Sequence, residues 1–115
     1  MSPPPDVAAH FVRATPNVRA TYDAILAAAR ALGPVREDAR KTSIHLVRAT
    51  AFAGVATRKH ALVLTLKAAQ RISSARVRRA QQTSANRWHL EIPLALPSEV
   101  DAELLRWLAD AYALA

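Results

Sequence analysis

The 115-residue sequence contains no cysteine, only two glycines and 5% aromatic residues. The absence of cysteine excludes disulfides, thiolate catalysis and cysteine zinc sites, and it suits a reducing cytoplasm better than a secreted scaffold. The paired glycines of phosphate-binding loops are missing, because Gly33 and Gly54 stand alone. No stretch approaches the roughly 20 apolar residues of a membrane helix, and the start has no basic region followed by an apolar run. We therefore expect a soluble cytoplasmic protein without membrane association.

The net charge of +7 is distributed unevenly along the chain. Residues 36–96 carry twelve Lys or Arg against three acidic residues, whereas residues 97–115 carry one Arg against four acidic residues. A basic middle of this kind attracts nucleic acid, anionic ligands or acidic protein surfaces. The alternative is an arginine-rich solvated surface that has no ligand.

The first third of the chain predicts a tail and two helices. Residues 1–5 include three consecutive prolines, which predict a disordered tail and leave 6–115 as a single domain. Asp6 is a candidate cap for a short helix over residues 7–14, in which Phe11 is the expected anchor. Thr15 and the proline after it start a second helix, which shows apolar residues every three or four positions and ends at Gly33.

After Gly33 the apolar period changes from 3.6 to 2, which predicts β-strands up to about Leu96. About five strands are expected, over residues 43–48, 51–56, 61–67, 76–81 and 87–94. The most regular alternation is that of Leu62, Leu64 and Leu66. Short connections favour an antiparallel sheet, because parallel pairing requires long crossovers.

A third helix follows, with Ser98 as its expected cap and Asp101 as the acidic member of a capping box. The whole chain therefore predicts an α+β domain with two N-terminal helices, an antiparallel sheet of about five strands and one C-terminal helix. The apolar faces of the strands define a core side that only the helices can cover. The helices are accordingly expected on one sheet face, with the other face open.

The open face is the expected place for a binding site. The alternation of the strands places His45, Lys67, Arg87 and His89 on this face, and Arg76 nearby on a strand whose register is not defined by the sequence. Arginine favours phosphate and carboxylate because its planar fork binds two oxygens at once. The arginines that begin at Arg76 equally suit an edge strand that avoids pairing with another sheet.

A tight turn at residues 57–60 is the second basic feature. It joins two expected strands and contains Arg58 and Lys59, which we include among the candidate ligand-binding residues. The alternative is a solvated hairpin end, which is a common position for charged residues. The two interpretations differ in whether the turn leans towards Arg87 and His89.

The four histidines do not form a strong metal signature. His89 and Glu91 have the H-x-E spacing of zinc deaminases, but those enzymes also need a cysteine pair that is absent here. A site built from His45, His60, His89 and Glu91 is chemically possible, although nothing in their spacing requires it. We assign no catalytic residue, metal or cofactor, and a metal-dependent enzyme is the third hypothesis for function.

The stretches FAGV, RKHALVLTLK, SANRWHLEI and DAELLRWLADAY, in this order, resemble a bacterial family catalogued as domain of unknown function 5655. The resemblance covers roughly residues 42–112 and implies a small bacterial α+β domain, alone or attached to others, without an assigned activity. The family's recurrent positions correspond here to Arg58, Lys59, Arg87, Trp88 and His89.

The leading hypothesis is a non-enzymatic module that binds nucleic acid or another polyanion through its basic sheet face. The low aromatic content argues against a stacking platform for single strands. The alternative is a protein-interaction or small anionic-ligand module. A pocket lined by His45 and His89 would favour this alternative, whereas a flat and uniformly basic surface would favour the polyanion. The sequence specifies no oligomeric state.

Overall fold

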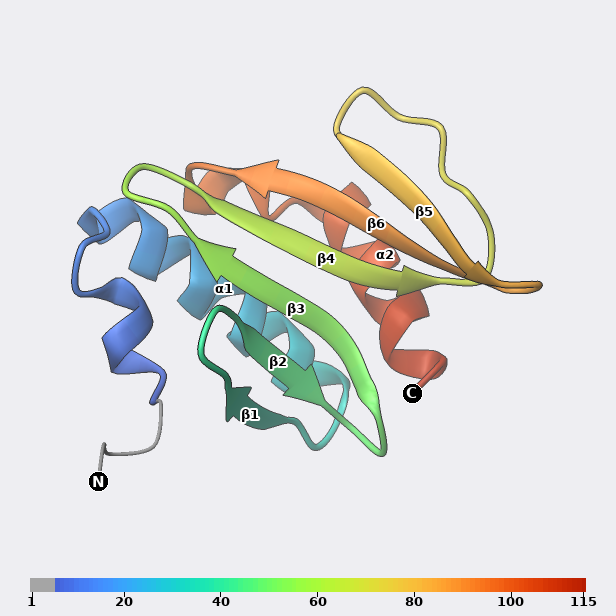
Figure 1. The fold of residues 1–115 in the computed structure, drawn as a ribbon, viewed down its shortest axis with the longest axis horizontal. Coiled ribbons are helices and arrows are strands. Elements are labelled where there is room, and N and C mark those ends of the chain that lie inside the picture. Colours follow the sequence, from blue (N-terminus) through green and yellow to red (C-terminus); the bar gives the residue numbers. More distant parts are fainter. Residues whose placement is uncertain (1–5) are drawn as a thin grey trace.

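The computed structural model describes residues 6–115 as two α-helices and a six-stranded sheet (Figure 1). In chain order the elements are the 3₁₀-helix η1 (Ala8–Phe11), α1 (Pro16–Leu32), β1 (Arg36–Ala39), β2 (Ile44–Val47), β3 (Ala51–Thr57), β4 (Leu62–Ala68), β5 (Arg79–Ser84), β6 (Arg87–Leu94), the 3₁₀-helix η2 (Pro97–Glu99) and α2 (Ala102–Ala113). All strand neighbours are antiparallel, in the order β1-β2-β3-β4-β6-β5. The predicted α+β class is confirmed. The tail expected at residues 1–5 lies outside the described residues.

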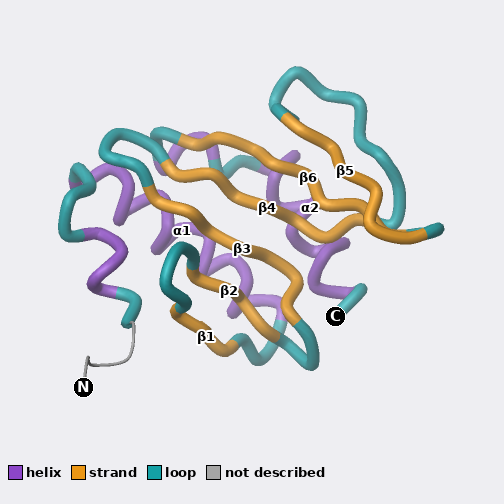
Figure 2. The backbone as a smooth tube through the Cα atoms, in the orientation of Figure 1, coloured by secondary structure: helices purple, strands orange, loops and turns teal. Residues whose placement is uncertain are grey.

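Helices α1 and α2 lie against the same face of the sheet (Figure 2). The alternation of β4 explains this arrangement, because Leu62, Leu64 and Leu66 are at most 1% exposed, whereas Thr65 and Lys67 on the opposite face are partly exposed. The opposite face of the sheet is left uncovered by any helix of residues 6–115. Neither α-helix in this part of the chain has the length and apolar run needed to cross a membrane.

The sheet contains a strand that the sequence pattern did not predict. Strand β1 has the sequence REDA, which shows no apolar alternation, and it is held by antiparallel pairing with β2. Its Glu37 points to the helix side and accepts a hydrogen bond of 2.5 Å from the hydroxyl of Tyr22. Burial, reinforced by this carboxylate, raises the pKa of Tyr22 far above its usual range.

The first predicted helix is wrong in type. Residues 8–11 form a single 3₁₀ turn, so the domain has two α-helices and not three. Asp6 does accept a hydrogen bond from the backbone N–H of Ala9, at 2.8 Å. Phe11 packs on Tyr22 with ring centroids 5.1 Å apart, as expected of an anchor. This aromatic contact is one of the interactions that hold the segment in place without a full helix.

Helix α1 ends at Gly33, as predicted. Gly33 has a φ of +154°, and a Cβ at this position would collide with the hydroxyl of Tyr112 in α2. That hydroxyl donates a hydrogen bond of 3.1 Å to the carbonyl oxygen of Pro34. The glycine therefore allows the end of α1 and the end of α2 to meet.

The cap of helix α2 lies three residues after the predicted cap. Asp101, not Ser98, is the cap residue, and its carboxylate accepts a hydrogen bond of 3.1 Å from the N–H of Leu104. The preceding turn is closed by Glu99, whose carboxylate accepts hydrogen bonds from the N–H groups of Ala95 and Leu96. Two acidic side chains thus share the role that the sequence pattern assigned to one capping box.

Candidate functional site

A row of paired residues crosses the uncovered face of the sheet. The register places His45 of β2 opposite Gly54 of β3, Gly54 opposite Thr65 of β4, and Thr65 opposite Glu91 of β6. Glu91 in turn lies opposite Arg79 of β5. Residues two apart on a strand project from the same side, so the neighbouring row on this face contains Lys67 paired with His89.

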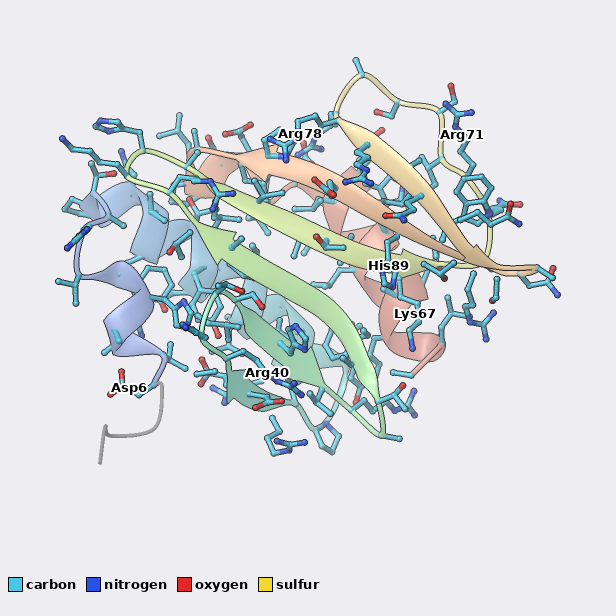
Figure 3. The ribbon with its side chains drawn as sticks, in the orientation of Figure 1. Asp6, Arg40, Lys67, Arg71, Arg78 and His89 are labelled. Carbon is cyan, nitrogen blue, oxygen red and sulfur yellow. The ribbon has the colours of Figure 1, made fainter. Side chains whose placement is uncertain are left out.

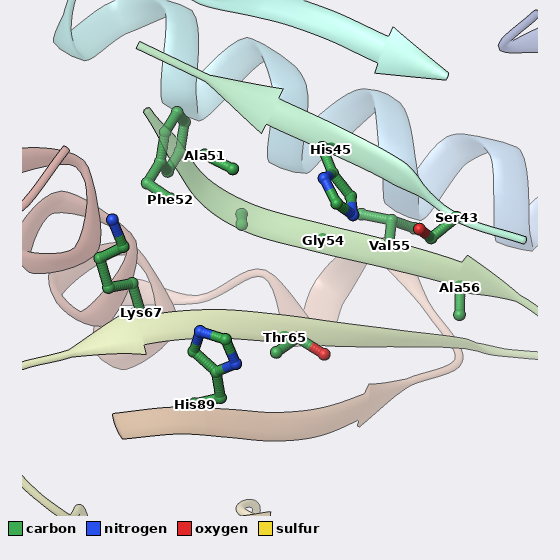
Figure 4. Close-up of a pocket in the computed structure, with 11 residues that line it drawn as sticks. Ser43, His45, Ala51, Phe52, Gly54, Val55, Ala56, Thr65, Lys67 and His89 are labelled. Atoms are coloured by element: carbon green, nitrogen blue, oxygen red, sulfur yellow. The ribbon is translucent and has the colours of Figure 1, made fainter. Parts of the chain in front are cut away.

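A shallow hollow with a volume of about 250 Å³ lies over β3 on this face (Figure 4). The β3 residues that line it include the small residues Ala51, Gly54 and Ala56. Polar side chains from the neighbouring strands surround it, namely Ser43, His45, Thr65, Lys67 and His89. The sheet therefore has a trough where β3 presents almost no side chain to solvent.

Gly54 leaves this space open, although the backbone conformation at this position does not require a glycine. A Cβ at Gly54 would meet only Cδ2 of His45, at 3.7 Å, which is an ordinary contact. The register of β2 and β3 shifts two residues earlier, at Phe52. The bulge turns both Phe52 and Ala53 into the core, where they are 1% and 6% exposed.

The imidazoles of His45 and His89 lie on opposite sides of the hollow (Figure 4). Strands β2 and β6 are separated by three strand spacings, so the two backbones are about 14 Å apart. Gly54 of β3, which has no side chain, and Thr65 of β4 lie between the two strands. The rings therefore flank a gap of ligand size and do not converge on a single atom.

Lys67 is the cation of the hollow that keeps its charge free. Its Nζ donates a hydrogen bond of 3.2 Å to the hydroxyl of Thr50, and no carboxylate of residues 6–115 forms an ion pair with it. The nearby arginines differ, because Arg78 and Arg79 lie 2.9 and 3.7 Å from the two oxygens of Glu91. The field in the hollow thus comes mainly from Lys67.

The structure separates two predicted residues from the hollow. Arg87 is on the same face as His89 but lies at the β5–β6 turn, where its Nη1 donates a hydrogen bond of 2.7 Å to the carbonyl oxygen of Asn86. Arg76 precedes β5, which begins at Arg79 and not at residue 76 as predicted. Its guanidinium group bonds the carboxylate of Asp101 at the start of α2, whereas Lys67 and His89 lie side by side on the sheet (Figure 3).

The guanidinium group of Arg76 anchors the start of α2. Its Nη1 lies 2.8 Å from the carboxylate of Asp101 and 3.3 Å from that of Glu103, and its Nη2 donates a hydrogen bond of 2.6 Å to the carbonyl oxygen of Glu99. The hydrogen bond to Asp101 raises the pKa of Arg76 and lowers the pKa of Asp101. The charge of Arg76 is therefore engaged within the fold.

Arg58 and Lys59 lie at the β3–β4 turn and do not line the hollow, whose lining on β3 ends at Ala56. Strand β4 runs from Leu62 at this turn to Ala68 beside the β5–β6 end, a length of about 20 Å at the usual rise per residue. The turn does not lean towards His89. Its backbone instead accepts a hydrogen bond of 2.8 Å, from the N–H of Thr15 to the carbonyl oxygen of Lys59.

A second and larger recess, with a volume of about 820 Å³, adjoins this turn. We call it the hairpin-end cleft, and its cationic and imidazole side chains are His10, Arg13, Lys41, Arg58 and Lys59. These residues come from η1 and its flank, the β1–β2 connection and the β3–β4 turn. Of the candidate residues, three line the hollow, Arg58 and Lys59 line the cleft, and Arg76 and Arg87 line neither. The other three cationic or imidazole residues of the cleft were not suggested by the sequence pattern.

The family match covers nearly all of the chain. Residues 7–115 match the model of a domain of unknown function (DUF5655). The chain belongs to the DUF5655 family. The match extends the resemblance of residues 42–112 through α1 and η1. No curated protein and no solved structure matches the chain.

The DUF5655 domain does not assemble a metal centre from its described residues. No group of three or more His, Asp or Glu side chains within residues 6–115 is placed to hold a metal ion. The H-x-E spacing of His89 and Glu91 leads instead to an ion pair, because the Glu91 carboxylate faces Arg78 and Arg79.

Proposed function

We propose that this DUF5655 domain is a non-catalytic module that binds a compact oxyanion, a carboxylate or phosphate group, in the hollow over β3. The observation that carries the proposal is Lys67, an unneutralised ammonium group at the wall of a concave site. The imidazoles of His45 and His89 and the hydroxyl of Thr65 supply further hydrogen-bonding groups around the same space. A recess with a few polar groups at its walls is the usual form of a small-ligand site.

A compact ligand fits this face better than an extended polyanion. Of the arginines near the hollow, Arg78 and Arg79 face Glu91, and Arg40 lies 2.8 Å from Asp38. Lys67 is therefore the lysine of the hollow that forms no ion pair within residues 6–115, and Arg87, which also forms none, lies on this face outside the hollow. The aromatic residue that lines the hollow, Phe52, is 1% exposed and offers no surface on which a base can stack.

Binding without catalysis is the simpler assignment for this set of groups. A nucleophile requires an adjacent base that a third group orients. His45 and His89 make no side-chain hydrogen bond to another residue of the described chain, so neither is held in one tautomer. Because the chain has no cysteine, we expect the module to act in a reducing cytoplasm.

The proposal is tested by titrating the domain with phosphate, acetate and glycerol phosphate while recording amide NMR shifts. The expected shifts lie at Gly54, Thr65 and His89, and they saturate. Lys67→Met is expected to weaken binding at least tenfold, because a charge-assisted hydrogen bond contributes about 1.5–3 kcal/mol. The matched control is Lys59→Met, which removes the same charge at the other end of the hairpin. Equal losses in the two variants would refute the site.

A second variant tests the hollow without changing any charge. Gly54→Val places a branched side chain on the floor of the hollow, in a strand where such residues are favoured. We expect it to abolish oxyanion binding while the thermal unfolding transition stays cooperative. Retained binding in a folded Gly54→Val domain would show that the anion binds elsewhere.

A further inference from the structure

The hairpin-end cleft is a rigid place where three segments far apart in sequence meet. The hydroxyl of Thr57 donates a hydrogen bond of 2.6 Å to the carbonyl oxygen of His10, and the imidazole of His10 bonds the carbonyl oxygen of Arg40 at 2.7 Å. The N–H of Thr15 donates to the carbonyl oxygen of Lys59. These bonds tie η1 to both turns, so the backbone that carries the cleft residues is held in place.

The cationic side chains of the cleft form no ion pair with a carboxylate of residues 6–115. Among the ion pairs of residues 6–115, none includes Arg13, Lys41, Arg58 or Lys59. No carboxylate lines the cleft. By contrast, Arg76, Arg78 and Arg79 form ion pairs with Glu91 or with carboxylates at the start of α2. Four like charges around one recess repel one another, and a bound polyanion would relieve that repulsion.

We propose that the hairpin-end cleft binds the phosphate backbone of a single-stranded nucleic acid without reading its sequence. The volume of about 820 Å³ exceeds that of the hollow by more than threefold and accommodates a stretch of chain. Two guanidinium groups, from Arg13 and Arg58, match the geometry of phosphate oxygens. This site is separate from the oxyanion hollow and does not depend on it.

We do not expect the cleft to recognise bases, because no Phe, Tyr or Trp lines it and the imidazole of His10 is bonded to the carbonyl oxygen of Arg40. Phe11, the nearest aromatic residue in sequence, packs on Tyr22 and lies under the guanidinium of Arg19 at 4.8 Å. Without a stacking surface, affinity comes from phosphate contacts, so it depends steeply on salt. Four contacts predict a slope of log K against log salt of about −3 for a single strand.

The experiment measures the fluorescence anisotropy of two labelled 20-nucleotide single strands, one of thymidine only and one of mixed sequence. The salt concentration is varied between about 50 and 200 mM, because each phosphate contact is expected to contribute about −0.7 to the slope of log K against log salt. The cleft variant is Lys41→Ala with Lys59→Ala. The control is Arg71→Ala with Arg106→Ala, which removes two exposed charges outside the cleft. In the cleft variant we expect at least tenfold weaker binding and a slope of log K against log salt that is shallower by about 1.4. In the control we expect less than a twofold change in affinity.

Several results would overturn the proposal. Equal losses in the two double variants would indicate general electrostatic attraction, and absent binding at the lowest salt would exclude the site. Binding of tripolyphosphate or of a polyglutamate peptide without binding of either oligonucleotide would assign the cleft to another anion. A tenfold preference between the two oligonucleotides would contradict sequence-independent contact. The Gly54→Val domain serves as a further arm, since its oligonucleotide affinity is expected to match that of the unmodified domain.

Discussion

The hollow over β3 and the hairpin-end cleft lie at two places on the same hairpin, but they are built in different ways. The hollow consists of strand residues whose positions follow from pairing, with His45 and Thr65 on either side of Gly54. The cleft consists of turn residues held by three hydrogen bonds to η1 and its flank. A regular sheet therefore produces a small site with one free lysine, whereas three loops together produce a larger recess that concentrates charge.

Charge reversal is expected to give the largest effect and to separate the two regions completely. Lys41→Glu with Lys59→Glu should weaken oligonucleotide binding about a hundredfold, because each lost phosphate contact is also replaced by repulsion. Lys67→Glu should abolish phosphate binding in the hollow and leave oligonucleotide binding within threefold. Anisotropy and NMR titrations measure the two affinities. If either reversal affects both ligands equally, the two regions act as one surface.

Gly33→Ala is expected to lower stability while leaving both regions intact. The added Cβ meets the hydroxyl of Tyr112 in a backbone conformation that L-residues rarely adopt. We expect the free energy of unfolding in urea to fall by about 2 kcal/mol. Adding Tyr112→Phe should recover part of this loss. Unchanged affinities for both ligands below the unfolding transition would show that neither region depends on the contact between α1 and α2.

Thr57→Val tests whether hydrogen bonding holds the cleft together. The substitution keeps the shape of the side chain but removes the hydroxyl that bonds the carbonyl oxygen of His10. We expect a loss of about 1 kcal/mol in stability, faster amide exchange around Phe11 and about threefold weaker oligonucleotide binding. Thr65→Val is the matched control, because it removes a hydroxyl from the hollow. If oligonucleotide binding falls equally in both variants, the separation of the cleft from the hollow is contradicted.

The smallest expected effect concerns the start of α2, outside both regions. Because its hydrogen bond to Arg76 lowers the pKa of Asp101 in the folded state, this carboxylate stabilises the fold above its unfolded pKa of about 3.9. The stabilisation is lost as pH falls through the folded value. Asp101→Asn should therefore unfold slightly more easily at pH 7, and the difference should vanish in acid, as urea titrations at several pH values would reveal. A difference in stability that persists in acid would show that Asp101 acts through the helix cap alone and not through its bond to Arg76.

Much of the fold was predictable because apolar alternation directly reports burial. Leu62, Leu64 and Leu66 are buried as predicted, and α1 ends at Gly33 as predicted. Strand β1 escaped prediction because REDA is held by backbone pairing, which leaves no hydrophobic signal. The cap of α2 was misplaced because Ser98 and Asp101 are both good cap residues, and Arg76 selects the second through an ion pair.

The candidate site was predictable only in part. Alternation correctly placed His45, Lys67 and His89 on one face, since side chains of a strand alternate with a period of two. Arg58 and Lys59 were grouped with them, but the distance along β4 separates the two sets. Nothing local to Arg13 or Lys41 indicated that each would lie beside the β3–β4 turn.

The structure of the β3–β4 hairpin thus depends both on local sequence and on contacts between distant segments. The amino-acid order alone specified which faces of the strands are apolar, where α1 stops and that the middle of the chain is basic, because these properties depend on neighbours within a few residues. The division of the basic residues into a hollow, an internal anchor at Arg76 and a cleft arose from contacts between distant segments. Such contacts depend on register, turn placement and hydrogen bonds such as that between Thr57 and His10, which no local pattern encodes.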